Sequence, residues 1–353
     1  MKKTIQHNKP ALGKEEIRAV FSIISSGWIA SGKETEKFEN EFGGYLGYKK
    51  GQAAAVSNGT AALYVSLMAL GIKPGDQVIV PAYVCSAVLN AVFLAKAKPV
   101  LADINKDDLN ISYEEVRKKI TSKTKAIIVS HTFGMPADIG RLLKLRIPII
   151  EDCAQALGSK INGKYAGTFG KIATFSFYAS KLMTTGYGGM ILSKDKAVMK
   201  KIKDYLQFDC RKDYKPRFNF LMSDIQAAMG RAQLKKLSGF LKKRKQIADI
   251  YYKSFPQDKV WPPKEKGKQP NFFRFLVKSG NPSKIKKYLE SRGIKTIIPI
   301  ETYELLHRYL KENPGQFPAS EWASKNLLSI PVYPSLGFSE VGKIKKETGK
   351  ILN

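Results

Sequence analysis

Short apolar runs alternate with helix-like stretches between about residues 50 and 195 of this chain. Continuous apolar runs of this length are typical of strands buried on both faces, and helices between them indicate a mainly parallel sheet. The sequence therefore predicts a three-layer α/β domain, with helices on both sides of the sheet. The runs are "AAAVS" (53–57), "QVIVP" (77–81), "KPVLAD" (98–103), "KAIIVSH" (125–131), "IPIIED" (147–152), "IATFSF" (172–177) and "GMILS" (189–193).

Other segments indicate where helices begin and where a second domain follows. "SGKE" (31–34) and "SYEE" (112–115) fit the capping-box pattern that starts a helix. Residues 222–255 have the character of long helices, and the segments after them mix one apolar run with two helices. We predict a large α/β domain over residues 1–245 and a smaller C-terminal α+β domain over residues 246–353.

The charge is strongly unbalanced: 60 lysines and arginines face 30 acidic residues, a net charge of +30. Such a balance can serve nucleic acid, an anionic membrane or a phosphorylated substrate. The basic residues are spread along the chain, however, and aromatic residues do not interleave with them as base stacking requires. We therefore expect the basic residues to lie on solvent-facing surfaces and not to bind nucleic acid. The net positive charge would still attract small anions.

Cysteine, histidine and hydropathy patterns narrow the class further. Cys85, Cys153 and Cys210 are too few and too scattered for a disulfide framework. The three histidines lie far apart and form no metal-binding motif, so we expect no metal. No apolar stretch reaches the roughly 20 residues that a membrane helix needs, and no apolar segment follows the N-terminal lysines. The expectation is a cytoplasmic protein without a membrane partner.

Ligands of open α/β sheets bind at the carboxyl ends of the strands, so the residues after each run matter most. After the first run, Gly59 and Thr60 begin a helix-forming stretch whose free amides could bind a phosphate, or could form an ordinary turn. Asp152 ends the fifth run, where a buried carboxylate needs a cation or caps a helix. Gln155, three residues on, could face the same pocket.

Lys181 follows the sixth run and precedes a glycine cluster, a setting unlike that of the solvent-facing lysines. Alone it could be a rim lysine in an ion pair. A lysine amine in a closed pocket can also form a Schiff base with an aldehyde cofactor. Pyridoxal phosphate (PLP) needs an acid beside its ring nitrogen and a phosphate-binding cup as well. Asp152 supplies the acid, and the "NGT" turn with Ser176 supplies the cup.

The chain resembles the sugar aminotransferases of the DegT–StrS group, within fold type I of the PLP enzymes. The resemblance implies that Lys181 binds the cofactor covalently and moves the proton, and that Asp152 contacts the pyridine nitrogen. It implies Gln155 near the ring hydroxyl. The similarity runs almost end to end, through "SSGWIASGKETEKFENEF", "NGTAALYVSLMALGIKPGDQVIVPAY", "EDCAQALGS", "SFYASKLMTTGYGGM", "DIQAAMGRAQL" and "LLSIPVYPSL". The residues it implies for the phosphate are Gly59, Thr60 and Ser176.

The resemblance also implies how the protein assembles, and comparison with the family pattern shows positions at which this chain differs. Asn219 matches an asparagine that reaches the phosphate of a neighbouring subunit, which implies a homodimer with shared active sites. Cys85 stands where the family usually has an aromatic residue that stacks on the cofactor ring. Leu221 and Tyr187 also differ from the common pattern. Candidate substrate contacts are Trp28, Tyr187 and His307, each of which could equally be a packing residue.

The function implied is amino transfer from an amino acid, commonly glutamate, to a nucleotide-linked keto sugar in polysaccharide or secondary-metabolite assembly. Dehydratases of the group carry histidine in place of the lysine, so Lys181 argues against them. One alternative is a basic, non-enzymatic binding protein on the same fold, supported only by the net charge. Another is a different PLP reaction on a non-sugar substrate. A cysteine desulfurase is a weaker alternative, because Cys85 lies in the wrong context for a nucleophile on a mobile loop.

Overall fold

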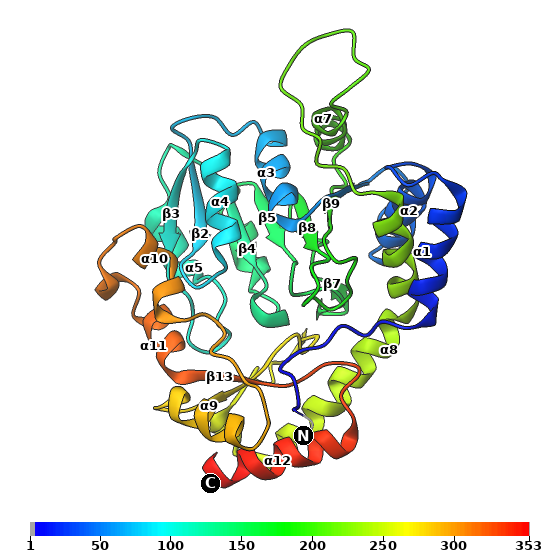
Figure 1. Ribbon diagram of the computed structural model, residues 1–353. Helices are drawn as coiled ribbons and strands as arrows, with labels where there is room; N and C mark the ends of the chain where they lie inside the picture. Colours follow the sequence, from blue (N-terminus) through cyan, green and yellow to red (C-terminus); the bar gives the residue numbers. More distant parts are fainter. Residues whose placement is uncertain (1–3, 353) are drawn as a thin grey trace.

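Seven strands form the central sheet of the computed structural model, which describes residues 4–352 (Figure 1). Their order is β1-β9-β8-β5-β4-β2-β3, and β9 runs antiparallel to both of its neighbours. Every predicted apolar run is a strand of this sheet, so the prediction of a mainly parallel sheet is confirmed. The strands are β1 (Ala53–Val56), β2 (Gln77–Pro81), β3 (Lys98–Ala102), β4 (Thr124–Ser130), β5 (Ile149–Asp152), β8 (Ile172–Ser176) and β9 (Gly189–Leu192).

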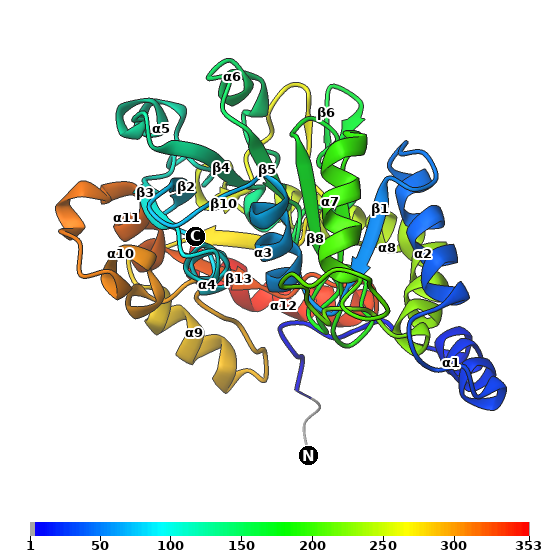
Figure 2. The ribbon, with the colours of Figure 1, turned by 90° about the horizontal axis from the view of Figure 1, so that it is seen from above.

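Helices cover both faces of the sheet, as the continuous apolar runs require. In β2, Val78 and Val80 pack into a core shared with α3, α4 and α7, whereas Ile79 packs with α5 and α6 on the other face. Figure 2 shows α3 and α4 on one side of the strands and α5 and α6 on the other. The covering helices are α2 (Lys33–Tyr45), α3 (Gly59–Ala69), α4 (Ser86–Leu94), α5 (Tyr113–Lys119), α6 (Ile139–Leu143), α7 (Lys196–Leu206) and α8 (Asp224–Ser254).

The two predicted helix starts have different outcomes. Ser112 does cap α5, since its side chain accepts a hydrogen bond from the Glu115 amide at 3.4 Å. The capping box at residues 31–34 is wrong: α2 begins after Gly32, which has no side chain to cap it. Asp224, the first residue of α8, provides the cap from far along the chain. Its carboxylate accepts from the amides of Gly32 at 2.8 Å and Thr35 at 2.9 Å.

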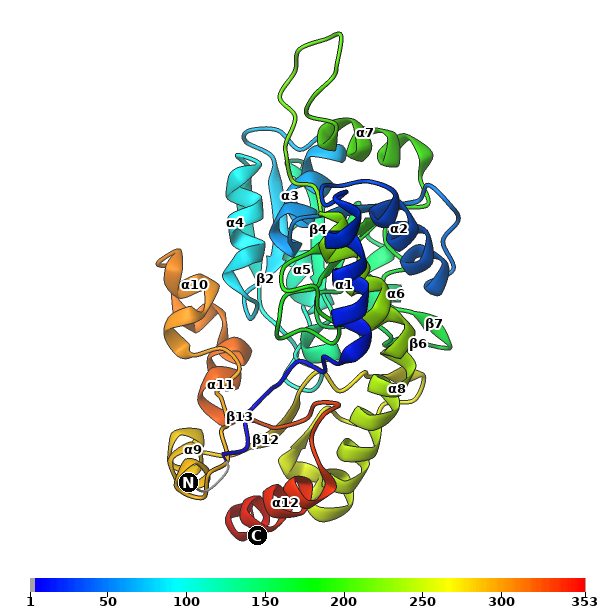
Figure 3. The ribbon, with the colours of Figure 1, turned by 45° about the vertical axis from the view of Figure 1, so that its right-hand side comes forward.

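The C-terminal part of the chain builds a second core beside the large sheet (Figure 3). Strands β10, β12 and β13 form an antiparallel sheet, against which α9, α12 and the C-terminal half of α8 pack. Because α8 is continuous across residue 245, a domain division there stays a prediction. The remaining elements are α1 (Lys14–Ser26), β6 (Lys160–Ile161), β7 (Lys164–Tyr165), β10 (Val260–Trp261), β11 (Lys268–Gln269), β12 (Phe275–Lys278), α9 (Pro282–Ser291), α10 (Leu306–Tyr309), α11 (Pro318–Asn326), β13 (Leu327–Ile330) and α12 (Phe338–Leu352).

The sheet register brings polar strand ends together. Ser130 at the end of β4 pairs with Asp152 at the end of β5, and Asp152 pairs with Thr174 of β8. Among the helices of residues 4–352, none combines the length and hydrophobicity that a membrane-spanning segment requires.

Candidate active site

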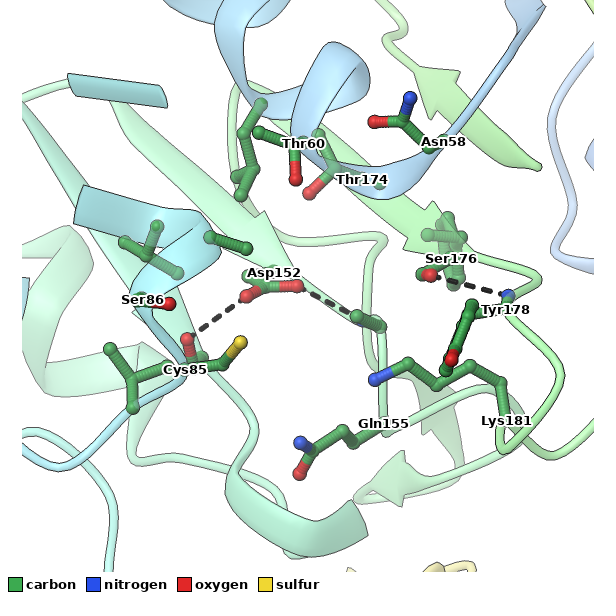
Figure 4. Close-up of a pocket in the computed structure, with 18 of the residues that line it drawn as sticks. Asn58, Thr60, Cys85, Ser86, Asp152, Gln155, Thr174, Ser176, Tyr178 and Lys181 are labelled. Carbon is green, nitrogen blue, oxygen red and sulfur yellow. Dashed lines mark hydrogen bonds between the residues drawn. The ribbon is translucent and has the colours of Figure 1, made fainter. Parts of the chain in front are cut away.

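A cavity of about 740 Å³ lies at the carboxyl ends of the parallel strands. Residues from β4, β5, β8 and the N-termini of α3 and α4 form its wall on the large-sheet side, and residues 274, 299, 300, 304 and 309 line it from the C-terminal part of the chain. The cavity is also where most of the predicted site residues meet (Figure 4). Those that line it are Gly59, Thr60, Cys85, Asp152, Gln155, Ser176, Lys181 and Tyr187.

The N-terminus of α3 forms one end of the cavity and has the features of an anion site. Asn58 caps the helix, accepting from the Ala61 amide at 2.8 Å. The amides of Gly59 and Thr60 belong to the first turn, where a helix has no acceptor of its own, so they can bind a phosphate. A Cβ added to Gly59 would lie 2.9 Å from the Cβ of Ser176. Glycine at this position therefore allows α3 and the end of β8 to approach each other closely.

Asp152 is held in place at the centre of the cavity. Its carboxylate accepts from the Ser130 hydroxyl at 3.2 Å and from the Ala154 amide at 3.0 Å (Figure 4). Gln155 is held in a similar way, because its Oε1 accepts from the Phe133 amide at 2.8 Å. That bond leaves the side-chain NH₂ group of Gln155 available as a donor. A fixed carboxylate and a fixed amide donor thus face one space.

Lys181 extends into this space from the turn after β8, and its amine points toward Asp152 and Gln155 (Figure 4). The Nζ atom lies 5.4 Å from the centroid of the Phe273 ring. Burial lowers the pKa of Lys181, although the nearby Asp152 carboxylate acts in the opposite direction. A larger fraction of the amine is therefore neutral, and nucleophilic, than for a lysine in water.

Three predicted residues do not enter this chain's cavity. Trp28 is 82% exposed in the turn after α1, and Asn219 is exposed between Phe218 and Phe220. His307 is buried in the C-terminal part, where its Nε2 lies 2.9 Å from Glu321 Oε1 and its ring stacks on Phe317 with centroids 4.6 Å apart. These contacts give His307 the packing role that its sequence position left open.

The two remaining departures from the family pattern differ in position. Tyr187 is 63% exposed at the edge of the cavity, with its ring 5.3 Å from that of Tyr178. Leu221 lies away from the cavity, packs against the core of the large domain and pairs with Val56 through an isolated bridge. Tyr187 is thus placed where a substrate can contact it, and Leu221 is not.

Sequence reasoning missed several residues of the cavity wall. Ser130 and His131 end a predicted strand, so their position alone could have identified them. His131 Nε2 lies 3.0 Å from Glu151 Oε2, and its Nδ1 accepts from the Ala137 amide at 3.0 Å. Burial disfavours a charged Glu151, but its bonds to His131 and to the Gly170 amide hold the pKa of that carboxyl below its ordinary value. The hydrogen bond between His131 and Glu151 thus holds the ends of β4 and β5 in place relative to each other.

Tyr83, Phe133 and Arg274 line the cavity as well, and the sequence carries no simple signal for them. Arg274 immediately precedes β12 of the C-terminal part, so it faces a strand-end cavity formed by a distant part of the chain. Only tertiary structure brings such residues together.

A three-layer α/β domain with a lysine, an aspartate and a helix N-terminus around one cavity is typical of the fold type I PLP aminotransferases. Residues 10–347 match the sequence profile of the DegT/DnrJ/EryC1/StrS aminotransferase family, and the chain belongs to this family. The chain is therefore an aminotransferase, and the alternative of a non-enzymatic basic binding protein is wrong. The family depends on PLP.

Similar proteins agree with this assignment. A GDP-perosamine synthase from Escherichia coli O157:H7 is 39% identical over 258 residues, which cover 70% of each chain. The crystal structure of the aminotransferase TlmJ from Streptoalloteichus hindustanus is 28% identical, covers 98% of both chains and superposes with a TM-score of 0.91. The PLP form of a sugar aminotransferase from Streptococcus pneumoniae is 27% identical, covers 99% of this chain and 100% of the other, and has a TM-score of 0.90. The predicted fold class is confirmed.

Proposed function

We propose that this aminotransferase moves an amino group from an amino acid, with glutamate as the donor, to a nucleotide-linked keto sugar. The observation that carries the proposal is the convergence of Lys181, Asp152 and the α3 N-terminus on one cavity. The similarity to a GDP-perosamine synthase supports a nucleotide sugar as the acceptor. Such a product suits the assembly of a surface polysaccharide or a secondary metabolite.

The cavity residues fit PLP as the cofactor. The amides of Gly59 and Thr60, together with the Ser176 hydroxyl, would hold its phosphate. Asp152 would hold a proton on the ring nitrogen, and the free NH₂ group of Gln155 would donate to the ring hydroxyl. When bound, PLP supplies an electron sink for the bond that breaks at the donor's α-carbon.

Side chains of the protein would then move the proton that leaves the α-carbon of the amino donor. With its pKa lowered by burial, Lys181 can accept the proton from the donor's α-carbon as a neutral amine and deliver it to the carbon of the cofactor's aldehyde group. Asp152 is fixed by the Ser130 hydroxyl and the Ala154 amide, so its carboxylate would stay beside the ring nitrogen when the cofactor is bound. The ring of Phe273 lies 5.4 Å from Lys181 Nζ and would limit the access of water to the amine on that side.

Each active site would be completed by a second copy of the chain. The segment that leads to Asn219 projects away from the body of the molecule, as an unlabelled loop next to α7 (Figures 1 and 3). Asn219 is exposed where this segment returns to the body of the molecule, because the Phe218 amide donates to the Tyr205 carbonyl at 2.8 Å and the Phe220 carbonyl accepts from the Ser57 amide at 2.7 Å. Phe220 lines this chain's own cavity. The Phe220 amide donates to the Phe218 carbonyl at 2.9 Å and the two rings stack, so Asn219 lies at the centre of a tight turn, where a partner chain could reach it. Its amide could donate to the partner's phosphate without burying another charge.

The cofactor assignment is tested on the purified protein. Borohydride reduction should fix a pyridoxyl group on Lys181, identified by peptide mass mapping. Lys181→Ala should still bind PLP but lose turnover, whereas Lys200→Ala, which removes an exposed lysine of α7, should behave as the wild type. A pyridoxyl group found on any other lysine would overturn the assignment.

The substrate assignment needs a separate screen. Nucleotide-linked keto sugars are incubated with glutamate, and the release of 2-oxoglutarate is measured. Transfer to at least one of these sugars, absent in Lys181→Ala, is the expected result. Transfer to non-sugar ketones alone would show that the acceptor is of another class.

A further inference from the structure

The N-terminal segment before α1 connects the C-terminal part of the chain to the turn after β8. Its beginning belongs to the second core, where Ile5 is 3% exposed. The Ile5 amide donates to the Gly293 carbonyl at 2.9 Å, and the Ile5 carbonyl accepts from the Lys295 amide at 2.9 Å. His7 follows, and its Nε2 lies 2.9 Å from the Ser329 hydroxyl of β13. The segment then crosses to the large domain and leads into α1 (Figure 3).

Asn8 of this segment contacts the turn that carries Lys181. Its Nδ2 donates to the Ser180 carbonyl at 2.8 Å. That carbonyl and the Lys181 N–H belong to one planar peptide unit, the unit that leads into Lys181. On the other side of the plane, the Lys181 N–H donates to the Tyr178 carbonyl at 2.9 Å. The peptide plane is therefore held on both sides, by the turn itself and by a residue 172 positions away in the sequence.

A second contact ties the same segment to the other end of the turn. Gln233 of α8 is 1% exposed and uses both ends of its side-chain amide. Its Nε2 donates to the Ala11 carbonyl at 2.9 Å, and its Oε1 accepts from the Thr184 amide at 3.3 Å. Thr184 follows Lys181 by three residues. The N-terminal segment thus supports the backbone before and after the lysine.

The backbone of Lys181 needs such support because it lies outside any helix or strand. A lysine amine sits on a flexible four-carbon stem, so its reach depends on where the backbone holds the base of that stem. The role proposed above requires the amine to reach two atoms, the cofactor's aldehyde carbon and the α-carbon of the donor. A displacement of about 1 Å in such an arrangement can slow a reaction about 100-fold.

We propose that Asn8 is a positioning residue for Lys181: its hydrogen bond to the Ser180 carbonyl fixes the backbone from which the amine extends into the cavity. The proposal rests on the function proposed above, which assigns Lys181 to the cofactor. Asn8 itself does not line the cavity and acts through the lysine alone. Because the same segment is anchored by Ile5 in the second core, it also holds Lys181 in a fixed position relative to the C-terminal part of the chain.

The test measures how fast the apoprotein binds PLP covalently. Wild-type and Asn8→Ala apoproteins are mixed with PLP in a stopped-flow instrument, and the visible absorbance of the covalent product is recorded. The covalent step should be about 2- to 10-fold slower in Asn8→Ala, the factor that one hydrogen bond provides. Asn8→Gln keeps an amide donor on a longer side chain and should recover part of the rate.

Non-covalent binding separates positioning of the lysine from a general effect on the cavity. The Kd of PLP is measured by calorimetry for Lys181→Ala and for the double variant Lys181→Ala/Asn8→Ala. The two affinities should be equal, because without the lysine Asn8 has nothing to position. Weaker binding by the double variant would show that Asn8 supports the cavity as a whole, and this result would overturn the proposal.

Asn326 provides a matched control at the end of α11. Its Nδ2 donates to the Trp322 carbonyl at 2.8 Å, the same kind of bond at the same distance. Asn326→Ala should therefore bind PLP covalently as fast as the wild type does. Circular dichroism reports whether each variant is folded. If Asn8→Ala does not fold, Asn8→Leu decides, because leucine keeps the size of the side chain and removes only the donor.

Hydrogen–deuterium exchange gives a readout without PLP. In the apoprotein, the amides of residues 181–185 should exchange faster in Asn8→Ala than in the wild type, and those of α7 should exchange equally. An unchanged rate of covalent PLP binding in Asn8→Ala overturns the proposal, whatever the exchange shows. Failure of the proposed function is instead detected on the wild type, where borohydride would fix the pyridoxyl group on a lysine other than Lys181.

Discussion

At Lys181 two opposing effects set the chemistry of one amine. Burial lowers its pKa, and the Asp152 carboxylate raises it, with burial the stronger effect. The neutral amine is the form that attacks an aldehyde. The rate at which apoprotein binds PLP covalently should therefore rise with pH, with a midpoint below the ordinary lysine value of 10.5.

Stopped-flow absorbance over a pH series measures this midpoint. Asp152→Asn removes the effect that raises the pKa, so its midpoint should lie lower than that of the wild type. A wild-type midpoint at or above the ordinary lysine value would contradict the assignment of Lys181 to a buried setting.

Cys85 precedes α4 and its side chain makes no capping hydrogen bond to that helix, so a substitution at this position removes no cap. Its side chain is exposed to the cavity. Cys85→Trp should place an aromatic ring over the cofactor and slow the loss of PLP on dialysis about 2- to 10-fold, the factor that ring stacking provides. Cys85→Ser, which keeps the size, should leave the rate unchanged. No change in Cys85→Trp, in either retention or substrate preference, would mean that position 85 does not face the ring.

Residue-scale prediction from the sequence worked where position along a strand decides function. Lys181, Asp152 and Gly59 follow strands, and the carboxyl ends of parallel strands share one edge of the sheet. Tyr83 and Arg274 were missed because no strand-end signal marks them. Which side chains of a distant segment face the cavity depends on every chain segment packed around it, which no local pattern records.

Among the elements, the strands were predicted closely, and the start of α2 was not. A strand buried on both faces is apolar at every position, and this signal is local. The cap of α2 is instead the carboxylate of Asp224 on α8, which accepts from the Gly32 and Thr35 amides and from the Thr35 hydroxyl at 2.6 Å. No pattern around residue 32 can reveal a cap supplied by another helix.

The same contact predicts a large effect of one substitution. Asp224→Ala leaves several donors of α2 buried without an acceptor and should lower the free energy of unfolding by about 2–4 kcal/mol. The Asp195 carboxylate caps α7 near the surface, where it accepts from the Ala197 and Val198 amides. Asp195→Ala removes this cap and should lower the free energy of unfolding by about 1 kcal/mol. Urea unfolding monitored by circular dichroism measures both. Equal losses in the two variants would show that Asp224 acts only as an ordinary cap.

For the whole molecule, the three-layer fold could be predicted from the sequence, because apolar runs that alternate with helix-like stretches fit few other architectures. The family resemblance implied what the pattern could not, namely an assembly in which two chains share each site, and this assembly stays a proposal. Asn219 is the residue that the proposed shared site assigns to the partner's phosphate. It is exposed and does not line its own chain's cavity.

Complementation between two inactive variants tests the shared site. Lys181→Ala and Asn219→Ala chains, each nearly inactive alone, are mixed under conditions that exchange subunits. If Asn219 serves the partner's phosphate, a mixed dimer has one site with both residues intact and one site lacking both. Random exchange makes about half of the dimers mixed, so activity should recover to about one quarter of the wild-type value. If Asn219 acts within its own chain, every site of the mixed dimer lacks one residue, and no activity returns. The shared site is refuted by absence of rescue when exchange is proven by mass-tagged subunits, and equally by a monomer that retains full activity.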